Sequence, residues 1–433
     1  MIILSQLKII IWETRKKLKR QCSKWHPKAR QKPKLAPEKL LLTVFFLHVF
    51  ILQASAAVTT IDIFEELPEQ KAPPKGWLEK IQQTRKGLEE NQGVIFASLF
   101  NSQQQIILHS KRDEGTSRNL WYYNLEIEKQ LWKGASAFIE FEVDKNKGVD
   151  KFLPTFSLFN DNGGENAGLY IPVLYLQQNF FQDKFYAYAG KLDLSYWFDF
   201  NEAAGSADTQ FQSSALVNNL TIPFPAKGMG AMFGMQPWEW LYFQSGVATA
   251  RASSTKIGLS DAFNSQLYLN ELGFIPKIKE LKGNYRFAFW LNHEKIGTID
   301  ESEEKDNDSG FALSFDQQIT KKLTLFCRYG LANQKVRDIA HFWSFGGQYT
   351  TSFGMCKKDY FGLGVAQSLI SNDYRDFNGP QVAPSETMAE AYYCWVFNDY
   401  VMLTPNLQAV INPDADKEAD NILVLGVRFL AVF

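Results

Sequence analysis

Apolar and polar residues alternate with a period of two along most of this chain. Within residues 137–143, for example, Ile139 and Phe141 lie on one side of the pattern while Glu140 and Glu142 lie on the other. Successive side chains of a β-strand point to opposite faces, so this alternation predicts strands with one apolar and one polar face. Roughly 16 to 17 such runs of about ten residues follow one another, as in a mid-sized transmembrane barrel.

One segment ahead of these strands has a different period. Leu78, Ile81, Arg85 and Leu88 recur at spacings of three and four residues, which predicts a short helix over residues 77–91. A glycine two residues later is the kind of residue that follows a helix end.

The segments that separate the strands fall into two size classes. Short polar turns occur at Lys133-Gly134, Thr320-Lys321-Lys322 and Asn398-Asp399. Long polar loops occupy residues 160–166, 202–210, 298–309 and 372–385. Short turns at one end and long loops at the other are typical of outer-membrane barrels.

A soluble β-sandwich is the alternative, because its strands also alternate. The polar faces here carry many charges and glycines, which a dry core would not tolerate unpaired. Phe433 ends an alternating strand, as in the signal for barrel insertion. Several apolar faces end in aromatic residues, as a girdle at the membrane interface would: Trp121, Tyr123, Tyr186, Tyr188, Trp395 and Phe397. We therefore predict an all-β fold, a transmembrane antiparallel β-barrel of about 16 strands with a short N-terminal helix.

The N-terminus has the layout of a secretory signal peptide. A basic stretch over residues 15–20 precedes an apolar run over residues 40–52 and the small-residue site Ala54-Ser55-Ala56. An uncleaved membrane anchor is the alternative, but a spanning helix needs about 20 apolar residues. The predicted organisation is a signal peptide with a long basic n-region over 1–56, a periplasmic segment and short helix over 57–92, and an outer-membrane β-barrel over 93–433.

Composition and charge narrow the classes further. Aromatic residues make up 15% of the chain, more than is usual in helix bundles or disordered chains. A mean hydropathy of -0.24 is too polar for a bundle of transmembrane helices. Of the 46 Lys and Arg residues and 47 Asp and Glu residues, 12 and 2 lie within residues 1–56, which leaves 34 and 45 for the rest. An acidic body with net charge -11 argues against a nucleic-acid partner.

Catalytic and metal chemistry find little support in the sequence. After the leader, the cysteines are Cys327, Cys356 and Cys394, which leaves open one disulfide or three packing thiols. No Cys/His cluster has metal-ligand spacing, and His109 and Ser110 would point to opposite faces of a strand. We expect no enzymatic activity, no metal and no cofactor.

A set of short segments between about Gly190 and Phe433 resembles the bacterial carbohydrate-selective porins of the OprB family. These segments are Gly190-Lys191-Leu192-Asp193, Asn218-Asn219, Gly283-Asn284-Tyr285-Arg286-Phe287, Asp316-Gln317, Phe326-Cys327-Arg328-Tyr329-Gly330, Tyr392-Tyr393, Leu403-Thr404-Pro405-Asn406-Leu407-Gln408, Asn412-Pro413 and Gly426-Val427-Arg428. The resemblance implies a 16-stranded barrel through which sugars diffuse across the outer membrane without energy coupling. In place of the family's opening motif, only Gly76-Trp77 and Arg85 are present here.

A channel for sugars needs fixed hydrogen-bond donors and acceptors, and aromatic surfaces for the sugar rings. Arg286 and Arg328 are the sharpest candidates, because a guanidinium group presents five donors in a planar fork. The predicted pore-lining residues are Arg286, Arg328, Lys191, Asp193, Asp316, Glu390, Tyr392 and Arg428. The lumen-facing register also includes Glu126, Glu140 and Trp290. The alternative is that these charges pair across strands and brace the wall without touching a solute.

The sequence thus predicts an outer-membrane porin for passive, carbohydrate-selective diffusion of small sugars. The alternatives are a general or anion-preferring porin, and a structural surface barrel whose long loops bind partners. The expected partners are carbohydrate solutes and outer-membrane lipids, with no nucleic acid. Both a homotrimer and a monomer are compatible with the pattern, and the expected location is the bacterial outer membrane.

Overall fold

The structure is a computed structural model that describes residues 77–111, 113–262, 264–305, 307–351 and 358–433. The predicted signal peptide over 1–56, most of the segment over 57–92, and Cys356 lie outside these residues. The chain divides into two compact units, Met1–Thr84 and Arg85–Phe433. The second unit contains the strands and is described below by itself.

The predicted N-terminal helix is confirmed as α3, Trp77–Gln92. It ends where Gly93 adopts a φ of +61° and donates its main-chain N–H to the carbonyl oxygen of Glu89. A left-handed residue after the last turn is a common helix ending, and glycine adopts it without steric cost. Among the described residues, none of the helices has the length and apolar run that crossing a membrane requires.

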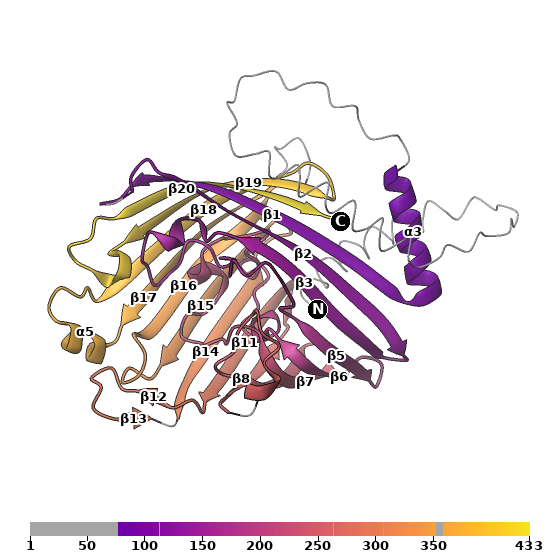
Figure 1. Cartoon of the computed structure of the whole chain (residues 1–433), viewed down its shortest axis with the longest axis horizontal. Coiled ribbons are helices and arrows are strands. Elements are labelled where there is room, and N and C mark those ends of the chain that lie inside the picture. Colours follow the sequence, from indigo (N-terminus) through magenta and orange to yellow (C-terminus); the bar gives the residue numbers. More distant parts are fainter. Residues whose placement is uncertain (1–76, 112, 263, 306, 352–357) are drawn as a thin grey trace, which may run out of the picture. The chain divides into compact units, whose positions relative to one another are not determined.

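The strands form one closed antiparallel barrel (Figure 1). Among the described residues one sheet contains 18 strands, of which β4 (Leu169–Tyr170) and β10 (Lys277–Ile278) are two-residue extensions, so sixteen make the wall. The wall strands are β1 Val94–His109, β2 Ser117–Trp132, β3 Ala135–Lys145, β5 Leu174–Phe180, β6 Phe185–Leu192, β7 Gly228–Trp238, β8 Leu241–Thr249, β9 Gln266–Phe274, β11 Leu281–Asn292, β14 Asp308–Gln318, β15 Leu323–Ala332, β16 Ile339–Thr350, β17 Tyr360–Ile370, β18 Ser385–Val396, β19 Val401–Ile411 and β20 Ile422–Val432.

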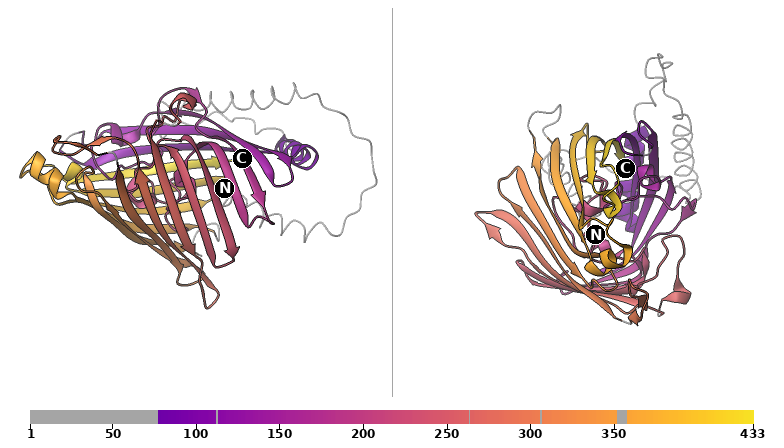
Figure 2. Two further views of the ribbon diagram at one scale, coloured as in Figure 1. Left: turned by 90° about the horizontal axis from the view of Figure 1, so that it is seen from below. Right: turned by 90° about the vertical axis from the view of Figure 1, so that its left-hand side faces the viewer.

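Each wall strand pairs with the next along the chain, and β20 closes the ring by pairing with β1. The closing register places Phe100 opposite Ala431 and Gln104 opposite Val427. The ring of strands is visible end-on in the right-hand view of Figure 2. Closure leaves no unpaired sheet edge, which a barrel in lipid requires. The prediction of about 16 strands is confirmed.

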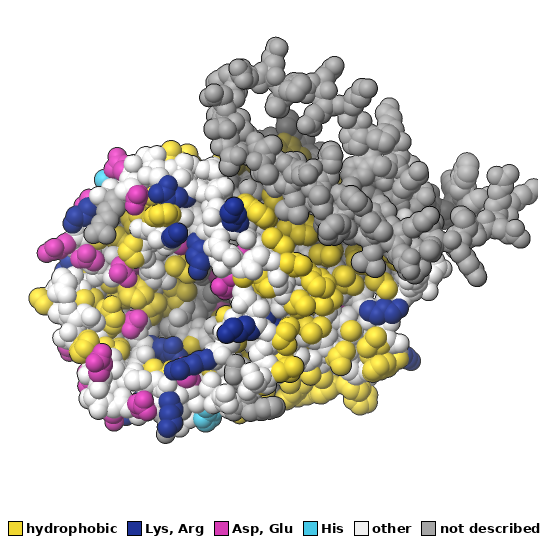
Figure 3. Space-filling model, viewed as in Figure 1, with side chains coloured by type: hydrophobic (Ala, Val, Ile, Leu, Met, Phe, Trp, Pro, Cys, Tyr) yellow, Lys and Arg dark blue, Asp and Glu magenta, His cyan; other side chains and the backbone are white. Residues whose placement is uncertain are grey.

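The two faces of the wall differ in chemistry, as the alternation predicts. On β15, Leu325, Tyr329 and Leu331 are exposed, whereas Phe326 and Arg328 on the other register are buried. Hydrophobic side chains cover the strands in Figure 3, and charged side chains gather at the end that carries the long loops. An apolar band around a barrel is the surface that faces lipid.

Short and long connections lie at opposite ends of the barrel. Lys133-Gly134 and residues 239–240 are short turns. The long loops contain α5 (Asn372–Asn378), the hairpin β12–β13 (Ile296–Gly297 and Glu304–Lys305), η4 (Leu259–Asp261) and η5 (Pro413–Ala415). Trp238 and Trp240 stack at a short turn with ring centroids 5.5 Å apart, where the membrane interface is expected.

The exposed register predicts a depth-dependent cost for charge. Leu363 is 63% exposed near the middle of β17, and Ile411 is 50% exposed at the end of β19. Leu363→Arg should lower the free energy of unfolding by about 2–4 kcal/mol, whereas Ile411→Arg should lower it by about 0–1 kcal/mol. Urea unfolding of the refolded barrel in lipid vesicles measures both values. Equal costs at the two positions would contradict a lipid-facing assignment of this register.

Candidate functional site: a restricted lumen

Two long connections fold into the barrel rather than away from it. The first, residues 193–227 between β6 and β7, contains η3 (Leu194–Tyr196) and α4 (Ser214–Val217), and we call it the inner loop. The second, residues 146–168 after β3, contains η2 (Gly148–Lys151), and we call it the second inner loop. Their hydrogen bonds to lumen-facing side chains fix where open space is left inside the wall.

Arg328 is the most extensive anchor of the inner loop. Its Nη1 donates to the carbonyl oxygen of Leu216 at 2.8 Å, and its Nη2 donates to the carbonyls of Ala204 at 2.8 Å and Asp199 at 3.1 Å. Its Nε also lies 3.1 Å from the Asp199 carboxylate. The side chain is completely buried. One guanidinium group therefore fastens both arms of the inner loop to β15.

Two further wall charges hold the far part of the inner loop. Arg428 on β20 donates to the carbonyl oxygens of Ala207 at 2.7 Å and Gln210 at 3.0 Å. Glu390 on β18 accepts the main-chain N–H groups of Gln212 at 2.8 Å and Ser213 at 3.0 Å. The cation thus binds loop carbonyls and the anion binds loop amides, which satisfies backbone groups that would otherwise be buried without partners.

Arg286 and Asp316 form an ion pair between adjacent strands. The Nη1 atom of Arg286 on β11 lies 2.8 Å from Oδ2 of Asp316 on β14, and both side chains are buried. Asp316 also accepts the main-chain N–H of Glu202 from the inner loop at 3.2 Å. This pair braces the wall and anchors the loop at the same time.

The second inner loop is held in the same manner and is joined to the first. Glu386 on β18 accepts the main-chain N–H groups of Phe156 and Ser157 at 3.0 and 2.7 Å. The carbonyl oxygen of Ser157 in turn accepts the main-chain N–H of Ala215 at 3.1 Å. The two loops therefore form one continuous inner layer against the wall.

Behind this inner layer the lumen is dry. A buried apolar cluster contains Phe211 and Leu216 of the inner loop together with Phe326 and Tyr392 of the wall. Gly364 on β17 faces this cluster, and a Cβ there would lie within about 3 Å of Phe211 and Leu216. Lumen-facing glycines thus give the inner layer room to pack closely. The expectation of a wet, charged interior is therefore wrong for this half of the barrel, because an apolar loop surface covers it.

Partly exposed side chains indicate open space beside β2, which only β1 separates from β20. Asn124, Glu126 and Glu128 occupy the lumen-facing register of β2 and are only half-buried. Lumen-facing side chains that keep solvent exposure must border an open lumen. Asp208 and Tyr196 of the inner loop are also half-buried. We call the space between β2, β3 and the inner layer the passage.

Charged groups gather around the passage, close enough to interact electrostatically. Glu126 interacts with Glu128 and Asp208, and Glu140 interacts with Asp193 and Lys227. We call the full set the passage ring, which consists of Glu126, Glu128, Glu140, Glu142, Asp161, Asp193, Asp208 and Lys227. The ring therefore holds seven carboxylates and one ammonium group.

Lys227 is embedded among these carboxylates. Its Nζ atom lies 3.8 Å from Oε2 of Glu142. Burial alone would lower the pKa of this ammonium group, but Glu142, Asp193 and Glu140 together raise the pKa above its usual value. Lys227 is therefore charged at neutral pH.

Asp208 projects from the tip of the inner loop and is held rigidly. Its Oδ1 accepts hydrogen bonds from Asn101 Nδ2 at 2.9 Å, from Asn162 Nδ2 at 3.3 Å and from the Tyr122 hydroxyl. Three donors on one oxygen fix the carboxylate. Asp208 was not among the residues predicted from the sequence, because it lies in a polar loop with no alternation to orient it.

An aromatic cluster borders the passage on the side of β5 and β6. Tyr175 and Tyr188 lie with ring centroids 5.3 Å apart, and Trp197 of the inner loop lies 5.1 Å from Tyr188. The prediction that Tyr186 and Tyr188 belong to the outer girdle is wrong. Tyr188 is buried, and the Tyr186 hydroxyl donates to Gln244 Oε1 at 3.1 Å inside the barrel.

The remaining predicted residues lie in different surroundings. Lys191 is on the opposite register from Tyr188, and its ammonium group donates to the carbonyls of Ile171 at 2.9 Å and Ser254 at 2.5 Å in two long loops. Asp193 belongs to the passage ring. Tyr392 packs in the dry cluster, and Trp290 is completely buried.

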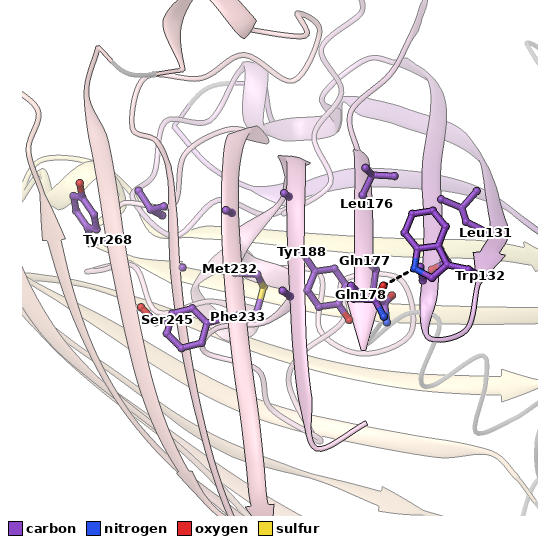
Figure 4. Close-up of a pocket in the computed structure, with 17 residues that line it drawn as sticks. Leu131, Trp132, Leu176, Gln177, Gln178, Tyr188, Met232, Phe233, Ser245 and Tyr268 are labelled. Carbon is purple, nitrogen blue, oxygen red and sulfur yellow. Dashed lines mark hydrogen bonds between the residues drawn. The ribbon is translucent and has the colours of Figure 1, made fainter. Parts of the chain in front are cut away.

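A cavity of about 650 Å³ lies along β3 and β5 to β9, away from the passage ring (Figure 4). Small residues of the outer register, such as Ala187, Ala189 and Ala231, form its floor. Trp132 and Phe233 border it, and Trp132 Nε1 donates to Gln178 Oε1 at 2.8 Å. Because this hollow is apolar and opens on the register that faces lipid, it is not the solute pathway. The described residues contain no group of acidic, histidine or cysteine side chains suited to hold a metal.

Comparisons with known proteins agree with this architecture. Residues 123–433 match the family model described as carbohydrate-selective porin, OprB family. The chain is 24% identical over 201 residues to Porin B of Pseudomonas aeruginosa, which covers 38% of this chain and 44% of that protein. It is 23% identical over 220 residues to Porin AaxA of Chlamydia abortus, covering 50% of this chain and 47% of that protein. The chain thus spans less than half the length of these two relatives.

A solved structure shows the same fold. OprB of Pseudomonas putida superposes with a TM-score of 0.68 at 17% sequence identity, covering 82% of this chain and 97% of that one. A closed barrel with an apolar outer band and a lumen narrowed by inward-folded loops defines a channel-forming barrel of the bacterial outer membrane. The chain belongs to the carbohydrate-selective porin family, OprB, as its match over residues 123–433 shows.

The anchoring role of Arg328 predicts what its removal does. Arg328→Met keeps the side-chain volume but leaves the Asp199 carboxylate and three loop carbonyls without their partner. Removing one member of a buried ion pair costs about 3–5 kcal/mol, so the inner loop should detach locally. Limited proteolysis should then cut within residues 193–227, and the single-channel conductance should rise.

The matched control is Arg251→Met in an exposed loop, where Arg251 pairs with Glu294 at the surface. This control should leave both the proteolysis pattern and the conductance unchanged. Wild-type protease resistance of Arg328→Met would contradict the anchoring role.

Proposed function

We propose that this barrel is a porin through which small sugars diffuse passively across the outer membrane. The observation that carries the proposal is the membership of the carbohydrate-selective porin family, together with the half-buried polar side chains that face the lumen from β2. Such a pore supplies no energy and works by selection at its narrowest part.

The chemistry of the passage suits polyhydroxylated solutes. Carboxylates and amides of Glu126, Asn124 and Asp208 offer acceptors and donors for hydroxyl groups. Tyr196, half-buried at the start of the inner loop, offers an aromatic face. These contacts are weak one at a time, which lets a sugar leave as readily as it enters.

In this proposal, the predicted pore-lining residues take four roles. Arg286, Arg328, Asp316, Glu390 and Arg428 set the width of the passage by holding the inner layer against the wall. Tyr392 fills the dry half of the lumen. Asp193 faces the solute, and Lys191 fixes long loops above the strands.

The alternatives predicted from the sequence fit less well. An anion-preferring pore would need the arginines at the passage, but Arg328 and Arg428 are covered by loop carbonyls. A structural barrel with partner-binding loops would need no open lumen beside β2. We also propose that the chain has no catalytic activity, because the family and the fold are those of a channel.

We further propose that residues 1–56 direct export and are removed, and that residues 57–92 stay in the periplasm. The passage lies within a single barrel, so a monomer and a homotrimer would conduct through the same path. Outer-membrane lipids would cover the apolar band, and nucleic acid would have no role.

Liposome swelling with a series of sugars tests the proposal. Swelling rates should be high for monosaccharides and should fall with solute size, because the inner layer restricts the lumen. Asn124→Trp, on the lumen-facing register of β2, should lower the disaccharide rate several-fold more than the monosaccharide rate. The matched control, Ala391→Trp on the exposed register of β18, should change neither. Absence of swelling above protein-free liposomes would rule out the porin function.

A further inference from the structure

The lumen-facing arginines of this barrel lie behind the inner layer, together with the buried carboxylates Glu386 and Glu390. Three lumen-facing arginines, Arg286, Arg328 and Arg428, are buried and bonded to loop carbonyls or to Asp316. The passage ring, by contrast, holds seven carboxylates and Lys227. A solute in the passage therefore meets negative charge, while the wall arginines are bonded behind the inner layer.

One carboxylate of the passage ring has a buried oxygen without a hydrogen-bond partner among the described residues. The Oε2 atom of Glu126 is buried and has no hydrogen-bond partner among the described residues. Among the described residues, its electrostatic neighbours include the carboxylates Asp208 and Glu128. A buried acceptor facing other acceptors is costly unless a donor or a cation occupies the space between them.

Asp208 of the inner loop interacts electrostatically with Glu126 and is bonded to Tyr122 of the same strand. Its Oδ1 already accepts three hydrogen bonds, from Asn101, Tyr122 and Asn162. Its position is thus fixed by uncharged donors, and the nearby Arg428 donates to the carbonyl oxygen of Ala207 and not to Asp208. Neighbouring carboxylates can share protons, but the ring stays negative as long as two of its seven carboxylates remain ionised beside Lys227.

We infer that the passage selects by charge, favouring positively charged solutes such as protonated amino sugars and excluding anionic sugars such as uronates and sugar phosphates. The selecting groups are Glu126 and Asp208, which interact electrostatically at the passage, and Lys227 moderates their field. This inference rests on the proposed porin function and adds a substrate class to it. Neutral sugars pass without this preference.

Reversal-potential measurements in planar bilayers test the inference. Under a potassium chloride gradient, the wild-type channel should prefer cations. Under a gradient of glucosamine hydrochloride the reversal potential should follow the glucosamine cation, and under a gradient of sodium glucuronate it should follow sodium and not glucuronate. Asp208→Asn and Glu126→Gln keep the size and hydrogen-bonding shape of each side chain. Each should lower the cation-to-anion permeability ratio about two- to fivefold.

Two further variants complete the test. Lys227→Gln removes the one base of the ring and should raise the permeability ratio. Glu239→Gln, in an exposed short turn, removes an equal charge far from the passage and should leave the ratio unchanged. A channel that conducts but prefers anions, or whose ratio is unaffected by Asp208→Asn and Glu126→Gln, would overturn the inference. Absence of any conductance would instead overturn the proposed porin function.

Discussion

Irregular backbone inside a barrel is the constraint on which this structure depends. Loop amides and carbonyls at membrane depth need partners, because neither lipid nor a dry interior supplies them. Here the wall supplies the partners from charged side chains. Arg328 binds three carbonyls, and Glu390 binds two amides. The size and position of the passage follow from where these anchors stand on the strands.

This arrangement divides the lumen into two halves with different physical roles. On the side of β15 to β20, apolar loop residues such as Phe211 pack against the wall and exclude water. On the side of β2 and β3, Glu126 and its neighbours keep solvent contact. The dry half fixes the loop in one place, and the wet half can then present Asp208 at a defined position. A loop that floated free in a wide lumen could not hold a carboxylate against the repulsion of others.

Much of the barrel could be predicted from local sequence, because a strand with one apolar and one polar face is compatible with few folds. The lumen-facing register of Arg286, Arg328, Glu390 and Arg428 was predictable from alternation alone. The register of β6 was not. Its tyrosines alternate with alanines. The pattern therefore fits equally well whether the tyrosines face the lipid or the lumen. A one-residue slip moves every side chain of a strand to the other face. Because the predicted register of β6 was shifted by one residue, the prediction placed Tyr188 outside the barrel and Lys191 inside it.

The roles of the charged lumen-facing side chains could not be predicted from the sequence, for a different reason. Alternation tells which side chains point inward, but their partners come from loops more than 100 residues away, as with Arg328 and Leu216. An inward arginine and an inward glutamate then look equally suited to touch a solute. The fold decides their roles, because the inner layer covers the arginines, Glu386 and Glu390, whereas Glu126 and Glu128 on β2 stay partly exposed. Charge selectivity in such a channel is therefore set by which wall segments the loops cover as much as by the number of charges on the strands.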